Sequence, residues 1–448
     1  MRGPSVPLSG TSFHGKIAGM RLRREIRPLA LFATMFAMLN GGPYGLEEVV
    51  PLAGPGLAIL VLSATAILWA VPYALIVAEL VSALPAEGGV YQWFRAGLGP
   101  FWSFQFAMLD WLTWVLDAAL YPPLVAAYFV GLVVDDPGHS VRWGISLVVI
   151  WGSTWLNVRG VKSVGSLSIL ITVAVLVPLA VMVVLGISYI PLAPLRPLIP
   201  EGRSFFTALN YALIWSLWSY SGYGAPASAG EEMVQPERNY PRALALFVPL
   251  SLAVFVLPLL VALGVSPDWR SWTAAQFNQT ASVVGGGWLL AASILAVQIS
   301  NVGMFNAELL VISRVPYAIA RDNLLPPALS RLHPRHGTPA RILVLAAILF
   351  SLLTYFFDFV QILVASTWIA LPAYLMTFAS PIILRLKHPE IRGPFRIPGG
   401  WPVLLPVCLV PSAIALYVLL TVEARHVLLG LGFIAAIPLA YLASRLRA

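Results

Sequence analysis

"NGGPYGLEEVV", residues Asn40–Val50, interrupts an apolar run that begins at Pro28. Three glycines, a proline and two glutamates stand where a membrane-spanning helix should be continuous. A second interruption, "SYSGYGAPASAG" at Ser219–Gly230, is likewise followed by two glutamates. Lipid cannot satisfy the backbone groups that glycine and proline release, so broken backbone survives only beside a cavity or other protein. Matching interruptions in two halves of a chain indicate an inverted-repeat transporter with its site near the membrane midplane. A simple kink in each helix is the alternative.

The composition indicates a membrane protein. Of 448 residues, 59% are hydrophobic and only 10% are charged, whereas soluble domains carry about 25% charged residues. Apolar runs of roughly 20 residues, long enough to cross a bilayer as a helix, recur along the chain. We therefore expect an all-α polytopic membrane protein with about twelve transmembrane helices. They are expected near residues 29–53, 56–83, 100–133, 141–157, 164–189, 205–230, 243–264, 284–319, 340–357, 360–384, 402–421 and 427–444.

The basic residues lie in the short connections between apolar runs and form no single patch. Residues 1–28 are polar and basic and lead straight into a full span, so we expect a disordered tail and no cleaved signal peptide. If this tail and alternate connections face the cytoplasm, most basic residues lie there, as is usual in membrane proteins. Both termini of a cell-membrane protein are therefore expected in the cytoplasm, and a nucleic-acid partner is not expected despite the net charge of +8. The outward exceptions are Arg142, Arg196, Arg203, Arg270 and Arg425.

Acidic residues at membrane depth are costly and call for a function or a partner. A buried carboxylate can bind an ammonium group or take up a proton. Asp117, in the middle of the third span, is the leading candidate, and Asp110 lies two helical turns earlier on the same face. Glu79 is expected to pack near the inner end of the second span. Glu308 is expected to form an internal ion pair with Arg314, although a coupling role for its carboxyl group is kept open.

Residues beside the two interruptions are further candidates. Glu47 and Glu48 follow the first interruption, and Glu47 is the one expected to face the transport path. Tyr44, Trp218 and Tyr223 could close over a substrate or hold an ammonium group by cation–π contact. Plain helix packing is the alternative for all three aromatic residues.

Several motifs resemble those of the amino acid–polyamine–organocation permeases, with the nearest likeness in the plant-type polyamine uptake and L-type amino acid transporter branch. The resemblance covers nearly the whole chain beyond the tail. The motifs that carry it are "GGPYGLEEVVPLAGPG" from Gly41, "VPYALIVAELVSALPAEGGVYQWFRAGLGPFWSFQ" from Val71, "WVLDAALYP" from Trp114, "GEEMVQPERNYPRAL" from Gly230, "SRVPYAIARDNLLP" from Ser313, "HPRHGTPARIL" from His333 and "RGPFRIPGG" from Arg392.

This resemblance implies a LeuT-type fold of five-plus-five inverted repeats with discontinuous helices 1 and 6. Residues 29–385 would form the ten-helix core, and residues 386–448 would add two helices. It also implies alternating access without a cofactor. Contact with substrate falls on Gly41, Gly42, Pro43, Tyr44 and Gly45 in the first broken helix, and on Trp218, Ser219, Gly222, Tyr223 and Gly224 in the sixth. Asp117 is similar to an acid of the polyamine-type members.

Two departures from the family pattern bear on the substrate and the coupling ion. Many relatives place an acidic residue where this chain has Gly224, which leaves Asp117 as the main candidate for binding an ammonium group. Some proton-coupled relatives carry a basic group inside the fifth span, whereas Lys162 precedes that span here. The expected function is a secondary active transporter of amino acids or polyamines, driven by protons, with an amine exchanger as the alternative.

Other classes fit the sequence less well. A channel would usually need oligomeric symmetry or rings of like residues. An enzyme would need a catalytic or metal-binding cluster, but the six histidines fall in the tail or in connections, and Cys408 is the only cysteine. We therefore expect no metal and no catalytic residue. A non-transporting membrane protein on the same fold remains a remote alternative.

Overall fold

The computed structural model describes residues 27–84, 90–130, 138–159, 164–193, 195–227, 233–273, 275–321, 324–421 and 437. Nearly all of the predicted tail and of the predicted twelfth helix near 427–444 lies outside these residues, as do Lys162, Glu231 and Glu232. The described part is helical and contains no strand. The short helices are η1 (Leu46–Glu48), η2 (Ala66–Ala70), η3 (Ile187–Tyr189), η5 (Trp269–Ser271) and η6 (Pro327–Ser330). The α-helices are α1 (Pro28–Leu39), α2 (Val49–Ala53), α3 (Pro55–Thr65), α4 (Val71–Ala83), α5 (Val90–Leu98), α6 (Pro100–Ala118), α7 (Tyr121–Val130), α8 (Gly138–Arg159), α9 (Val164–Gly186), α10 (Phe205–Ser219), α11 (Pro236–Val265), α12 (Gln276–Arg321), α13 (Ala340–Phe356), α14 (Phe359–Lys387) and α15 (Gly400–Thr421).

Seven helical segments in the described part are long and apolar enough to cross a membrane. They coincide with seven of the runs expected from the sequence. The shorter apolar helix α13 coincides with one more, the run expected at 340–357. The first and sixth runs do not qualify because each is interrupted, and α8, which covers the expected run 141–157, is not among the qualifying segments either. The segments are Pro55–Ala83, Pro100–Phe129, Ile169–Tyr189, Pro236–Val265, Gln276–Arg321, Phe359–Lys387 and Gly400–Thr421.

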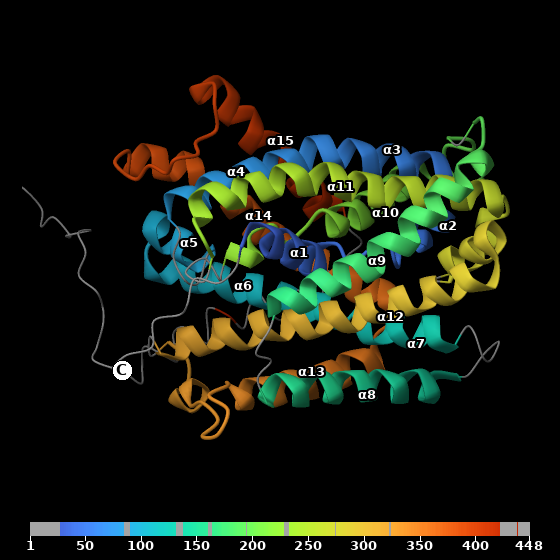
Figure 1. Cartoon of the computed structure of the whole chain (residues 1–448). Helices are drawn as coiled ribbons and strands as arrows, with labels where there is room; N and C mark the ends of the chain where they lie inside the picture. Colours follow the sequence, from blue (N-terminus) through green and yellow to red (C-terminus); the bar gives the residue numbers. More distant parts are fainter. Residues whose placement is uncertain are drawn as a thin grey trace, which may run out of the picture.

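The long helices run roughly alongside one another in a single bundle (Figure 1). In this view α8 and α13 pack together at the lower edge, while α3 packs with α11 at the upper edge (Figure 1). The interrupted helix α1 lies between these edges and packs against α9, α11 and α12. The first interruption is thus placed inside the bundle, where protein groups can satisfy its backbone.

Burial separates central helices from peripheral ones. In α14, 78% of the apolar window is buried inside the protein, and this helix packs against α6, α4, α10 and α15. In α15 only 28% of the window is buried, although this segment is more apolar than α14. A helix that is hydrophobic all round and exposed along one side suits contact with lipid. The core therefore sits around α6 and α14, which carry several of the candidate residues.

Two of the long helices contain an irregular turn. The rod formed by α3 and α4 is joined through η2, a π-helical turn at Ala66–Ala70, and π-turns inside α-helices often occur at functional sites. Helix α12 is kinked at Gly286, whose positive φ of 73° is open to glycine without steric cost. Beyond this kink the helix covers the eighth predicted span.

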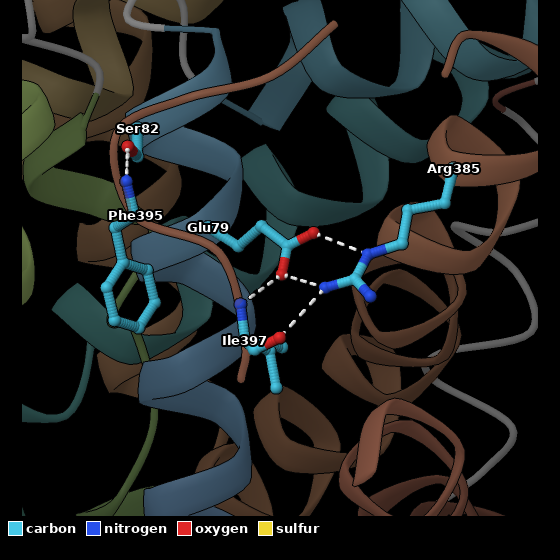
Figure 2. Close-up of polar contacts among 5 residues, drawn as sticks. All are labelled: Glu79, Ser82, Arg385, Phe395 and Ile397. Carbon is cyan, nitrogen blue, oxygen red and sulfur yellow. Dashed lines mark hydrogen bonds and ion pairs between the residues drawn. The ribbon is translucent and has the colours of Figure 1, made fainter. Parts of the chain in front are cut away.

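An ion pair fastens the end of α4 to α14 and to the segment before α15 (Figure 2). Arg385 donates from Nε to Glu79 Oε1 at 2.9 Å and from Nη2 to Glu79 Oε2 at 2.7 Å. The backbone N–H of Ile397 also donates to Glu79 Oε2 at 2.8 Å, and that of Phe395 donates to Ser82 Oγ at 2.8 Å (Figure 2). The packing role predicted for Glu79 is confirmed.

Candidate functional site

The first interruption lies between the end of α1 at Leu39 and the start of η1 at Leu46. Its backbone turns through positive φ at Gly41, Gly42 and Gly45. A Cβ at Gly41 would lie 2.0 Å from Met304 Sδ, so both the backbone angle and the space require glycine there. The local sequence therefore ends α1 where the chain enters the bundle interior.

Side chains from three other helices, together with Asn40 of the interruption itself, satisfy its backbone. The hydroxyl of Ser300 donates to the Gly41 carbonyl oxygen, and Trp215 Nε1 donates to the Gly45 carbonyl oxygen at 3.2 Å. The Gly45 N–H donates to the Tyr128 hydroxyl at 3.2 Å. Asn40 accepts from the Gly42 N–H at 3.1 Å and donates to Ser251 Oγ at 2.9 Å. The bundle thus supplies the partners that lipid could not.

The second interruption begins where α10 ends at Ser219 and leads into a short helical turn at residues 225–227. Trp69, in the π-turn η2, donates from Nε1 to the Tyr220 carbonyl oxygen at 3.1 Å. The Tyr240 hydroxyl donates to the Tyr223 carbonyl oxygen. This interruption is therefore also held by side chains of neighbouring helices, and its turn through Gly222 has a positive φ of 79°.

Both interruptions line one cavity. The first contributes residues 38–44, and the second contributes Trp218, Ser219 and Ser221. Helix α6 contributes Trp114 and Asp117. The remaining wall comes from Leu46, Tyr121, Phe255, Ser300, Asn301 and Met304. Two segments that are far apart in the sequence thus meet at a single hollow.

Asp117 is held in a fixed orientation at the edge of this cavity. Its Oδ1 accepts a hydrogen bond of 2.7 Å from Trp218 Nε1, and its Oδ2 accepts one of 2.9 Å from the Tyr121 hydroxyl. The residue is only 9% exposed. Hydrogen bonds to a carboxylate are among the stronger ones in proteins. Each oxygen keeps further capacity to accept a hydrogen bond.

The cavity favours positive charge. Asp117 is its only acidic side chain, and no Lys, Arg or His lies in the described wall. Helices α1 and α10 both end at this cavity with their C-termini, where the helix dipole carries roughly half a negative charge. A carboxylate and two negative helix ends together suit an ammonium group better than an anion.

A second and a third cavity continue from the first along α6. The second shares Trp114, Asp117, Trp218 and Ser221 with the first. The third shares Thr113, Trp114, Ala370 and Tyr374 with the second. Asp110, Gly222 and Gly224 line the third cavity. Residues predicted from both broken helices and from α6 therefore lie around adjoining spaces.

Most, but not all, of the predicted substrate-binding residues line the first cavity. Seven line the first cavity, namely Gly41, Gly42, Pro43, Tyr44, Asp117, Trp218 and Ser219. Gly45 lies outside that wall, although a Cβ on it would come within 3.6 Å of the Trp218 ring. Tyr223 is fully buried and stacks on Tyr73 with ring centres 5.1 Å apart.

Two predicted acids lie in the interior and line none of the three cavities. Glu47 is fully buried and accepts a hydrogen bond from the Tyr128 hydroxyl, so it braces the first interruption against α7. Glu308 is fully buried beside Asp117, and neither of its oxygens has a hydrogen-bond partner among the described residues. Arg314, its predicted partner, has an exposed side chain, and the described residues contain no ion pair between the two.

Sequence reasoning missed the contribution of α12 to the site. Ser300 binds the backbone of the first interruption, while Asn301 and Met304 line the cavity. The signal available was the cluster of polar residues Gln298, Ser300 and Asn301 in the middle of an apolar span. Within the described residues, no group of three or more His, Cys, Asp or Glu side chains is arranged to hold a metal ion.

The family model for amino acid permeases matches residues 30–440. The chain belongs to this family. A probable polyamine transporter of Arabidopsis thaliana is 32% identical over 422 residues, covering 92% of this permease and 83% of the plant protein. A polyamine transporter of Oryza sativa is 31% identical, covering 92% of the permease and 77% of the rice protein. An uncharacterized transporter of Legionella pneumophila is 29% identical over 371 residues. The permease is accordingly a multi-pass membrane transporter.

Proposed function

We propose that the protein is a secondary active transporter of polyamines or amino acids that works by alternating access. The observation that carries this proposal is the single cavity shared by the two helix interruptions. In inverted-repeat transporters, substrate binds at such a meeting point and one repeat rocks against the other around it. The proposed architecture has twelve spans, with a LeuT-type five-plus-five repeat and both termini in the cytoplasm.

The charge of the cavity supports an amine-bearing substrate. Asp117 is the proposed partner of the substrate ammonium group, assisted by the C-terminal ends of α1 and α10. The rings of Tyr44 and Trp218 line the same wall and could add cation–π attraction. Two of the plant relatives are named as polyamine transporters, which agrees with this chemistry.

Glu308 is the proposed carrier of a coupling proton. It is buried next to Asp117, and its two oxygens have no hydrogen-bond partner among the residues described. Two neighbouring carboxylates in an apolar region repel each other, so a proton on one relieves the cost of charging the other. Protonation of Glu308 would therefore leave Asp117 charged and ready for an ammonium group, which links proton uptake to substrate uptake.

The test is uptake of radiolabelled putrescine, arginine and leucine into proteoliposomes, with and without an inward proton gradient. Uptake that rises with the gradient supports the proton symporter. Uptake that requires preloaded amine and ignores the gradient supports the exchanger instead. Asp117→Asn should abolish cation uptake, and Glu308→Gln should remove the dependence on the gradient while exchange persists. Normal putrescine uptake by Asp117→Asn would overturn the proposed site.

A further inference from the structure

We infer that Asp110 forms a second ammonium-binding subsite, so that the transported solute is a diamine or polyamine held at both ends by α6. The inference rests on the proposed function, because Asp117 supplies the first subsite. It goes beyond that function by excluding solutes with a single ammonium group as preferred substrates. The argument depends on the spacing of the two acids, the cavities between them and the charges along α6.

Asp110 and Asp117 lie on one face of a continuous helix. Helix α6 runs unbroken from Pro100 to Ala118, and seven residues separate the two carboxylates. Seven residues make almost two whole turns, so both side chains point the same way, about 10 Å apart along the axis. This spacing is fixed by the helix and does not depend on a flexible loop.

Adjoining cavities line α6 between these two carboxylates. Asp117 lies where the first and second cavities meet. Asp110 lines the third cavity, which adjoins the second along Thr113, Ala370 and Tyr374. The middle cavity therefore lies between one carboxylate and the other along α6.

A buried polar atom in the middle cavity has no partner in the described structure. Thr367, on α14, is 5% exposed, and its Oγ1 makes no hydrogen bond with any residue described. Unpaired buried hydroxyls are uncommon, because leaving one unpaired costs free energy. An amine nitrogen passing through this cavity would supply the missing partner. Thr367 thus offers a polar contact between the two carboxylates.

Asp110 lacks a compensating cation among the residues described. Trp114, one turn along α6, is the neighbouring side chain that can donate a hydrogen bond to it, which leaves most of its accepting capacity unused. Tyr73 and Tyr374 line the same cavity as Asp110. A charged acid at this depth therefore has room for a cation from the solute.

The dimensions match aliphatic diamines. An extended single-bonded chain advances about 1.2 Å per bond, so the nitrogens of putrescine lie about 6 Å apart and the outer ones of spermidine about 11 Å. With a charge-assisted hydrogen bond of about 3 Å at each end, putrescine spans about 12 Å. It can therefore reach both carboxylates. The outer nitrogens of spermidine are about as far apart as the carboxylates, so each ammonium group can lie next to one carboxylate. Butylamine has the same carbon chain as putrescine but can occupy only one subsite.

The experiment measures competition against radiolabelled putrescine uptake by the purified full-length protein in proteoliposomes. Putrescine, spermidine and butylamine are the competitors for the wild type and for Asp110→Asn. For the wild type, we expect putrescine and spermidine to compete at concentrations at least tenfold lower than butylamine. In Asp110→Asn, the concentrations of putrescine and spermidine needed for half-maximal competition should rise at least tenfold. The concentration of butylamine needed should change less than twofold. Asp268→Asn, the same change at an exposed acid outside all three cavities, should leave the preference intact.

The outcomes separate the two proposals. If the wild type takes up none of the amines or amino acids, the proposed function fails. If it takes up putrescine but butylamine competes equally well, the second subsite is refuted without any variant. If Asp110→Asn retains the wild-type preference for diamines, the subsite is also refuted while transport stands. Should Asp110→Asn fail to fold, the comparison of butylamine with putrescine in the wild type still decides.

Discussion

Glu79 and Arg385 are 306 positions apart in the sequence and form a two-pronged ion pair at the end of α4. The two side chains are 9% and 7% exposed, respectively. The pair is also tied to the segment before α15, since the Ile397 N–H donates to Glu79 and its carbonyl oxygen accepts from Arg385 (Figure 2). Three separate parts of the chain therefore depend on one buried contact.

Removing the charge of Glu79 should destabilise the protein strongly. Glu79→Gln leaves the Arg385 guanidinium buried without its carboxylate, which typically costs about 3–5 kcal/mol. Thermal unfolding in detergent, followed by tryptophan fluorescence, measures the loss. Glu201→Gln is the matched control, because Glu201 pairs with Arg270 at 3.7 Å on the exposed surface, where such pairs contribute little. Equal melting temperatures for the two variants would contradict the buried-pair argument.

Gly41→Ala should disrupt the first interruption. The added Cβ would lie 2.0 Å from Met304 Sδ and 2.7 Å from Ser300 Oγ, at a φ of +54° that strains any residue with a side chain. Overpacking of this kind costs about 1–3 kcal/mol before the backbone strain is added. We expect a lower melting temperature together with loss of putrescine uptake.

Gly152→Ala is the control for that change. Gly152 lies within α8, and a Cβ there would have no atom within 4 Å. Alanine also favours the helix over glycine by about 1 kcal/mol, so this variant should be at least as stable as the wild type. Full uptake by Gly41→Ala would show that the first interruption can rearrange without affecting transport.

Tyr128→Phe should lower stability without changing selectivity. The Tyr128 hydroxyl accepts from the Gly45 N–H and donates to Glu47, so its loss leaves both buried groups without that partner. Such a loss costs about 1–3 kcal/mol. Because Glu47 lies outside the cavities, the ratio of putrescine to butylamine affinity should stay at the wild-type value. A changed ratio in the competition assay would place Glu47 on the transport path after all.

The sequence was sufficient to predict the interrupted helices because glycine and proline have strong local effects. Gly41, Gly42 and Gly45 all take positive φ, as expected of glycines that break a helix. Asp117 was identifiable because a charge in an apolar span is rare. These predictions use properties of a residue and its immediate neighbours.

Predictions that depended on distant partners were less complete. Arg314 was proposed for Glu308 because the two lie close in the sequence, but the Arg314 side chain is exposed. Glu79 pairs with Arg385, and Asn40 with Ser251, across large separations that no local pattern reveals. The side chains that satisfy the interruptions, such as Trp69 and Trp215, are likewise set by tertiary packing.

Trp218→Phe should weaken substrate binding by loosening Asp117. The substitution keeps an aromatic ring at the cavity wall but removes the indole N–H that donates to Asp117 Oδ1 at 2.7 Å. Hydrogen bonds to charged groups contribute about 1.5–3 kcal/mol, so the KM for putrescine should rise by about tenfold or more if that energy orients the carboxylate.

Trp143→Phe controls for the general loss of an indole donor. Trp143 Nε1 donates to the Ser351 carbonyl oxygen at 3.0 Å between α8 and α13, away from the three cavities. This variant should lower the melting temperature slightly and leave the KM unchanged. Tyr121→Phe removes the other donor to Asp117 and should raise the KM as Trp218→Phe does. Trp218→Phe and Tyr121→Phe could both keep the wild-type KM while Asp117→Asn abolishes uptake. In that case the Asp117 carboxylate binds substrate without needing these two hydrogen bonds, and its orientation by them does not explain its role.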